Sequence, residues 1–280
     1  MGSELLNPLM HQVASSPVFG DSFAISPAQQ DIMAGQMGMA IRAFSEETTA
    51  IFSQGMPEAP AERVTELVKS LIVTSVGFGA GLSAGELQDT SLVADLAILI
   101  GVTGWGNFLC DQKDEPMTYA ISLLCGREVE VPEHLVGQTH SRLDGLRHIE
   151  SKIQKIARPE DVPYLLRASR DELMLCEILA HELSEGLAAA NAQDSFLAKH
   201  AERAADILTV TAALPSAITP LYGAYRRENP DLPMLQEVYG DPLIHEFLRR
   251  ANVFVRVFDD LGDRGIDQQA FSLNVFNQAQ

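Results

Sequence analysis

The chain has 280 residues, of which 46% are hydrophobic, which is enough apolar material for one large core. Its formal net charge of −18 would repel nucleic acid phosphates and anionic lipid, so neither is an expected partner. Three scattered cysteines do not make a disulfide framework or a thiolate zinc site, which favours a reduced, cytoplasmic protein.

Apolar residues recur at helical spacing along most of the chain, so the sequence predicts an all-α protein. Residues 1–30, rich in Ser, Pro and Gly, are expected to form a loose N-terminal arm. Residues 31–280 are expected to form a single helical bundle with a central apolar cavity. Helices are predicted over residues 28–54, 60–78, 89–113, 117–124, 132–157, 159–190, 195–213 and 242–261, with breaks at Pro215 and Pro220.

The most hydrophobic stretch extends from Leu92 to Cys110. It contains Asp95 and three glycines, so a core helix is a better interpretation than a membrane span, and no stable membrane insertion is expected. The first residues also lack the basic and apolar segments of a signal peptide.

An acidic cluster follows this run. Asp114 and Glu115 lie three and four residues after Asp111, so all three are expected to share one helical face. Carboxylates at a helix C-terminus repel one another and the negative end of the helix dipole. A divalent cation would remove both problems, and magnesium binds carboxylate and phosphate oxygens together.

A second acidic cluster follows another apolar segment. Asp259, Asp263 and Asp267 recur every four residues, with Asp260 beside the first, and form a stripe on one side of the predicted helix. A single acidic run at a helix end is usually a solvated end. Two such runs, each ending an apolar helix, favour a shared metal site.

In these two motifs the chain resembles the class I terpene synthases. Asp259-Asp260-Leu-Gly-Asp263-Arg-Gly-Ile-Asp267 has the spacing of the family's second metal motif, with aspartates replacing its middle hydroxyl and its terminal Glu. Asp111 to Glu115 stands in the register of the first motif, although Gln112 replaces its second aspartate. The similarity covers roughly residues 60–270, and the family's C-terminal Arg-Tyr lid has no counterpart after Asp267. The resemblance therefore also implies either a shortened chain or a lid of different construction.

The resemblance implies that a prenyl diphosphate is the substrate and that about three Mg²⁺ ions assemble with its diphosphate. Asp111, Asp259 and Arg203 would be catalytic, and both acidic clusters would bind metal. Arg203, paired with Asp206 as in the family's diphosphate sensor, would contact the diphosphate, with Arg256 or Arg264. Candidate cavity residues, whose rings could stabilise a carbocation, are Phe78, Trp105, Phe108, Tyr222 and Phe254.

Two alternatives stay open at this point. The Asp259 to Asp263 spacing also satisfies the DxxxD pattern of head-to-head prenyl synthases, so a prenyl-coupling enzyme of the same fold, head-to-head or chain-elongating, is one. The other is a non-catalytic helical binding protein, favoured by the imperfect first motif and the missing lid. A homodimer is compatible with either.

Overall fold

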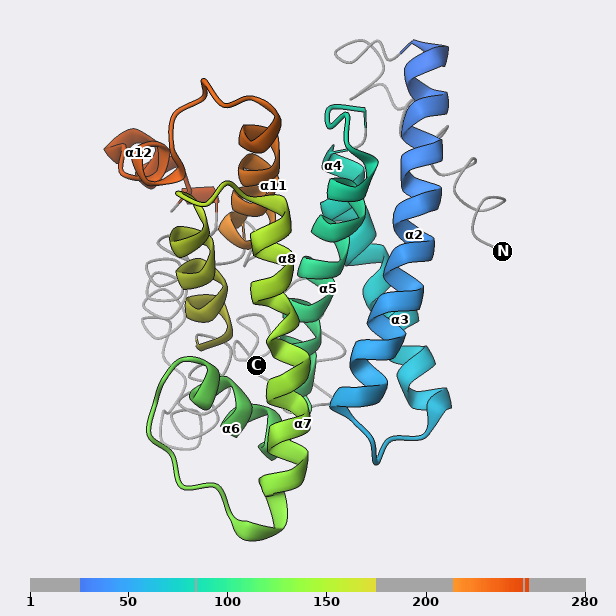
Figure 1. Ribbon diagram of the computed structural model, residues 1–280, viewed down its shortest axis with the longest axis vertical. Coiled ribbons are helices and arrows are strands. Elements are labelled where there is room, and N and C mark those ends of the chain that lie inside the picture. The colour runs from blue at the N-terminus through green and yellow to red at the C-terminus, as the bar shows by residue number, and fades with distance from the viewer. Residues whose placement is uncertain (1–25, 84, 175–213, 249, 252–280) are drawn as a thin grey trace, which may run out of the picture.

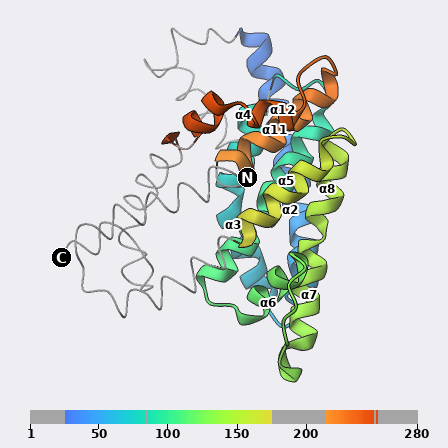
Figure 2. The ribbon, with the colours of Figure 1, turned by 90° about the vertical axis from the view of Figure 1, so that its left-hand side faces the viewer.

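The computed structural model describes residues 26–83, 85–174, 214–248 and 250–251. These residues form helices joined by short connections and contain no strand, which confirms the all-α prediction for the described part of the chain (Figure 1). Turned by 90°, the same helices stack beside one another, with α2 (Pro27–Gly55) and α7 (Val136–Leu146) running along the long axis (Figure 2).

The elements range in length from 29 residues to single turns of three residues, and residues 125–132 form a long connection between two of them. In chain order they are α2 (Pro27–Gly55), α3 (Ala61–Ser75), the π-helical turn η1 (Val76–Ala80), α4 (Gly81–Ser83), α5 (Thr90–Asp111), α6 (Glu115–Leu124), the 3-10 turn η2 (Glu133–Leu135), α7 (Val136–Leu146), α8 (His148–Ile156), α11 (Leu214–Glu228) and α12 (Leu235–Tyr239). Residues 162–174 and 242–248 are also helical.

Helix α5 is the centre of the bundle and packs against α2, α3, α7, α8 and α11. It begins at the N-cap Asp89, whose side chain accepts a hydrogen bond from the backbone N–H of Ser91. The carboxylate of Glu228, at the end of α11, accepts two more N–H groups there, those of Gln88 and Asp89, at 3.0 and 2.8 Å. In the described part of the chain, α5 alone is long and apolar enough to cross a membrane, and 67% of its apolar window is buried within the bundle.

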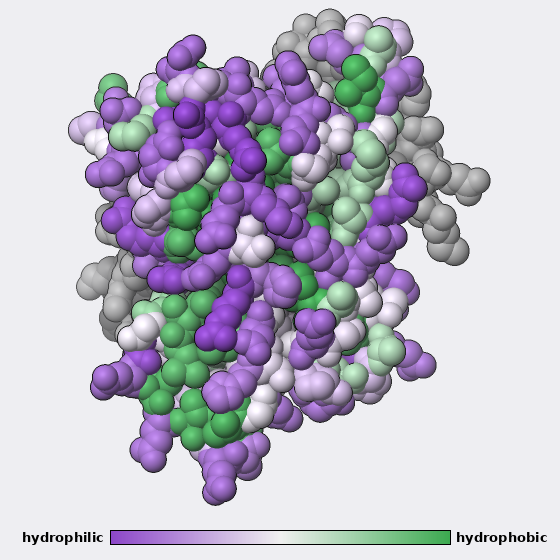
Figure 3. Space-filling view, viewed as in Figure 1, coloured by the Kyte–Doolittle hydropathy of each residue, from purple (hydrophilic) through white to green (hydrophobic). Residues whose placement is uncertain are grey.

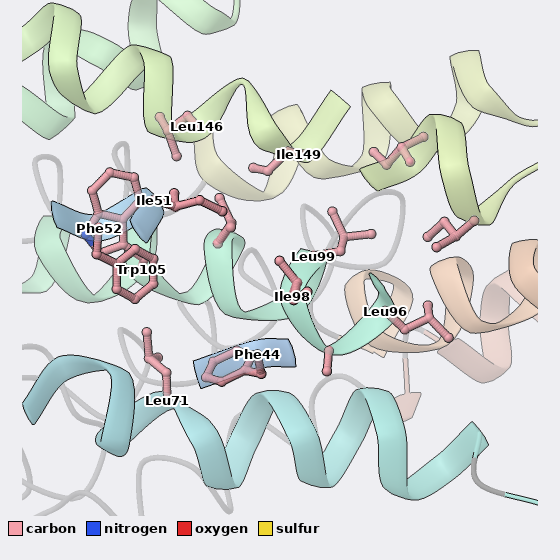
Figure 4. Packing of buried hydrophobic residues seen from close by; sticks show 14 of the residues in the cluster. Phe44, Ile51, Phe52, Leu71, Leu96, Ile98, Leu99, Trp105, Leu146 and Ile149 are labelled. Atoms are coloured by element: carbon pink, nitrogen blue, oxygen red, sulfur yellow. The ribbon is translucent and has the colours of Figure 1, made fainter. Parts of the chain in front are cut away.

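Helix α2 begins with a capping box. Ser26 accepts the N–H of Gln29, the Gln29 side chain accepts the N–H of Ser26, and Pro27 occupies the first turn. Its buried face includes Phe44 and Ile51, spaced to face α5. Gly101 of α5 lies against the Phe44 ring, and any larger residue there would collide with it (Figure 4). The two helices can therefore approach closely at this point.

Trp105 of α5 fills the space between α2 and α7. Its ring is fully buried and stacks on Phe52, with 5.0 Å between the ring centroids (Figure 4). Gly55 of α2 and Gly145 of α7 both touch the indole, and a Cβ at Gly145 would stand 2.6 and 2.7 Å from two of its ring carbons. The helices α2 and α7 can therefore both pack against Trp105 of α5, because each presents a glycine at the contact.

Three buried cations, each holding two carboxylates, connect helices that are distant in sequence. Each cation supplies one positive charge to two acids, so the structure itself neutralises part of the excess negative charge. The three clusters are Lys152 with Glu47 and Asp95, Arg142 with Glu58 and Asp114, and Arg226 with Glu160 and Asp161.

Two predicted boundaries are wrong. The single helix predicted over residues 132–157 is divided by a turn at Arg147, whose N–H bonds the carbonyls of Gly145 and Leu143. The apolar spacing continues through this turn, so the pattern cannot reveal it. Pro220 was also predicted to break the chain, but it lies buried inside α11. Helix α11 continues through it without the backbone hydrogen bond that an N–H would donate.

Candidate functional site

The predicted first acidic motif lies at the turn from α5 to α6. Helix α5 ends at Asp111, Lys113 has a positive φ of 58°, and Asp114 is the N-cap of α6, which begins at Glu115. Pro116 favours a new helix here because its ring would collide with the carbonyl of Gln112 if α5 continued. The expectation that Asp111, Asp114 and Glu115 share one face of a continuous helix is therefore wrong.

The carboxylate of Asp114 is held by protein groups. Its Oδ1 accepts the backbone N–H of Met117 at 2.9 Å and Nε of Arg142 at 3.3 Å. Its Oδ2 accepts Nη2 of Arg142 at 3.1 Å. The sequence predicted a metal ion that neutralises this acidic cluster. At Asp114, the positive charge comes from the guanidinium of Arg142.

Arg142 is the buried centre of this corner. Its side chain is 2% exposed, pairs with Glu58 at 2.5 Å, and also donates to the carbonyl of Gly55 at the end of α2. Burial opposes the charged forms, but the hydrogen bonds and charges within the cluster raise the pKa of Arg142 and lower that of Glu58. Sequence reasoning missed Arg142; the available signal was a charged residue beside the apolar Leu143 and Leu146 of α7.

Glu115, in contrast, is exposed at the first turn of α6. A carboxylate there is favoured by the helix dipole. Nearby, Nη2 of Arg63 donates to the side chain of Gln112 at 3.0 Å. Among the described residues no three His, Cys, Asp or Glu side chains are close enough to hold a metal.

The other predicted metal and diphosphate residues lie outside the described residues, so their position relative to Asp111 stays a prediction. They are Asp259, Asp260, Asp263, Asp267, Arg203, Arg256 and Arg264, together with the predicted cavity residue Phe254.

The described aromatic candidates lie in different surroundings. Trp105 belongs to the packed core, and its indole N–H has no hydrogen-bond partner among the described residues. Phe108 is partly buried against the same core. The hydroxyl of Tyr222 donates to the carbonyl of Pro233 at 2.9 Å, and burial raises its pKa. Their role as cavity walls stays a prediction.

Two of the surface clefts in the described part of the chain lie beside helices of this bundle. One, of about 460 Å³, is lined by three arginines and lies where α6 ends beside the helix over residues 162–174. The other, of about 720 Å³, lies between the connection after α8 and the residues after α11. None of the described cavity candidates, Trp105, Phe108 and Tyr222, lines either cleft. The face in Figure 3 is mainly hydrophilic, and hydrophobic side chains gather around α6.

Comparison with known proteins found no matching protein-family model and no significantly similar curated protein or solved structure.

Proposed function

We propose that this chain is a class I terpene synthase, which ionises a prenyl diphosphate with Mg²⁺ and releases a terpene hydrocarbon or alcohol and diphosphate. The observation that carries the proposal is the pairing of two acidic motifs, the first of which ends the central apolar helix α5. The all-α arrangement around α5 is compatible with the bundle that this activity requires.

The roles within the first motif follow from their surroundings. Asp114 is committed to Arg142 and to the cap of α6, so we assign it a positioning role. Asp111, the last residue of α5, and the exposed Glu115 would supply metal-binding oxygens. The net charge of −18 and the acids of both motifs would repel a diphosphate at this site, so bound cations are needed there.

The second motif would supply the remaining carboxylates, from Asp259, Asp260, Asp263 and Asp267. The bound ions would neutralise the leaving diphosphate and lower the barrier to carbon–oxygen cleavage. Arg203, with Arg256 or Arg264, would hold the diphosphate by paired guanidinium contacts.

Product analysis tests this proposal. The protein is incubated with Mg²⁺ and, separately, geranyl, farnesyl and geranylgeranyl diphosphates, and the extracts are analysed by gas chromatography. A terpene product that disappears with EDTA is expected with at least one substrate. Asp259→Asn and Glu115→Gln should lower the rate by about 100-fold. Absence of product from all three substrates would refute the proposal.

A non-catalytic helical binding protein is the second candidate, favoured by the commitment of Asp114 to Arg142. A ligand of the native state must raise the thermal midpoint. Mg²⁺ with pyrophosphate should therefore raise the midpoint of an enzyme above the value with pyrophosphate and EDTA, and equal midpoints in the two conditions would favour the binding protein. Adding isopentenyl diphosphate to the incubation distinguishes a chain-elongating prenyl-coupling enzyme from a terpene synthase, because a longer diphosphate would then form.

A further inference from the structure

The smaller cleft carries a concentration of positive charge that is unexpected in so acidic a chain. Arg127 follows the end of α6, and Arg167 and Arg170 come from the helix over residues 162–174. The described lining residues include one acid, Asp171. Three positive side chains and one negative side chain therefore share a space of about 460 Å³.

Contacts with the surrounding protein hold two of these arginines in place. Nη2 of Arg170 pairs with Glu150 of α8 at 2.5 Å, and the thiol of Cys125 donates to the Arg170 carbonyl at 3.6 Å. The guanidinium of Arg167 lies 5.2 Å from the centre of the Tyr164 ring. Such a contact restrains the planar group without neutralising its charge.

Arg167 and Arg170 are also like charges three residues apart on one helix, an arrangement that destabilises a helix unless an anion lies near. Glu150 supplies an anion to Arg170, and Asp171, four residues after Arg167 on the same helix, adds a second acid. With Glu150 counted, three basic and two acidic side chains meet at this cleft, so it keeps a net attraction for an added anion.

The walls between the charges are apolar. Leu166 and Met174 line the same cleft, and its volume is in the range of small-molecule sites. Guanidinium groups bind phosphate oxygens in pairs, and the apolar walls fit a short hydrocarbon group beside the phosphate. We propose that this cleft binds a small organic phosphate or diphosphate without a metal ion.

This cleft is separate from the first acidic motif. Cys125 caps the end of α6, whereas Glu115 begins it, and ten helical residues separate the two ends by about 15 Å. The proposal therefore concerns a second anion site and does not depend on terpene synthase activity.

Calorimetric titration of the full chain with inorganic pyrophosphate, in excess EDTA, tests the inference. Saturable binding is expected, and Arg127→Gln and Arg167→Gln should each weaken it by about 10- to 100-fold. Both side chains are exposed, so neither change should prevent folding. Asp171→Asn, which removes a negative charge from the cleft, should tighten it.

The matched control is Arg147→Gln, because Arg147 is also exposed and pairs only with its neighbour Asp144 among the described residues. It should bind pyrophosphate like the wild type. Absence of saturable binding in EDTA, or equal affinity in the Arg167→Gln variant and the wild type, would overturn the proposal. Acetate and succinate form a parallel arm, and tighter binding of these carboxylates than of pyrophosphate would overturn the phosphate assignment.

An Asp259→Asn variant separates this inference from the proposed function. It should form product about 100-fold more slowly and keep EDTA-resistant pyrophosphate binding. Loss of both together would place the anion at the metal centre and overturn the proposal of a second site.

Discussion

Replacing Arg142 by methionine would remove the one buried cation at the turn between α5 and α6. Methionine is unbranched and uncharged and replaces the stem of the arginine, but it is two atoms shorter, so the ion pairs with Asp114 and Glu58 are lost and the space of the guanidinium head is left empty. The carbonyl of Gly55 also loses its donor. The change therefore tests whether Arg142 organises this corner.

The expected loss follows from the exposure of the three side chains. Removing one partner of a fully buried ion pair costs about 3–5 kcal/mol because the remaining charge stays unpaired. Here Arg142 is 2% exposed, but the side chains of Asp114 and Glu58 are 18% and 38% exposed and can partly rehydrate. The free energy of unfolding should therefore fall by about 3 kcal/mol, at the lower end of that range.

Urea unfolding at pH 7, followed by circular dichroism, measures this loss. At a denaturant slope of about 3 kcal/mol per molar, the midpoint should fall by about 1 M. Arg147→Met is the control, because that exposed pair with Asp144 should change stability by less than about 0.5 kcal/mol.

The triple variant Arg142→Met, Asp114→Asn, Glu58→Gln leaves no carboxylate unpaired at this corner. It should recover most of the lost stability, because a neutral cluster avoids the cost of burying charge. If Arg142→Met is as stable as the wild type, or if the triple variant is no more stable than the single one, the reasoning about this cluster is wrong.

Three further results are expected. The pKa of Glu58 is lowered from its ordinary value of 4.5, so the stability that its charge contributes is present above pH 4.5 and is lost as the pH falls through the pKa of the folded state. The difference in unfolding free energy between the wild type and Arg142→Met should therefore narrow below about pH 4.5. Gly145→Ala should destabilise the protein by about 1–2 kcal/mol through its collision with Trp105, whereas Gly137→Ala, in open space on the same helix, should not; equal effects in urea unfolding would contradict the packing. Burial raises the pKa of Tyr239 to about 12, so an ultraviolet titration of Tyr239→Phe should lack one late-ionising phenol, and loss of an early one instead would contradict its burial.

Much of the helical framework could be predicted from local pattern. The predicted helices over residues 60–78, 89–113 and 117–124 correspond to α3 with η1, α5 and α6, with differences of a few residues at their ends. Their apolar spacing depends only on residues close together in the sequence, so it predicts the helices without knowledge of the tertiary structure. The run from Leu92 to Cys110 was assigned to the core because it is strongly hydrophobic yet contains Asp95 and three glycines, and it is largely buried within the bundle.

The first acidic motif shows where local pattern stops being informative. Spacing placed Asp111, Asp114 and Glu115 on one helical face, but the positive φ of Lys113 turns the chain between them. The charge that satisfies Asp114 comes from Arg142, which is 28 residues away in the sequence. No periodicity connects these two positions.

The sequence by itself determined that the described chain is helical, that α5 is its apolar centre, and that acids gather where α5 ends. Only the tertiary structure decided which cation meets which acid and which glycines admit Trp105. The reason is physical: helix formation depends on neighbours within four residues, whereas charge pairing and close packing depend on side chains that folding brings together from distant helices.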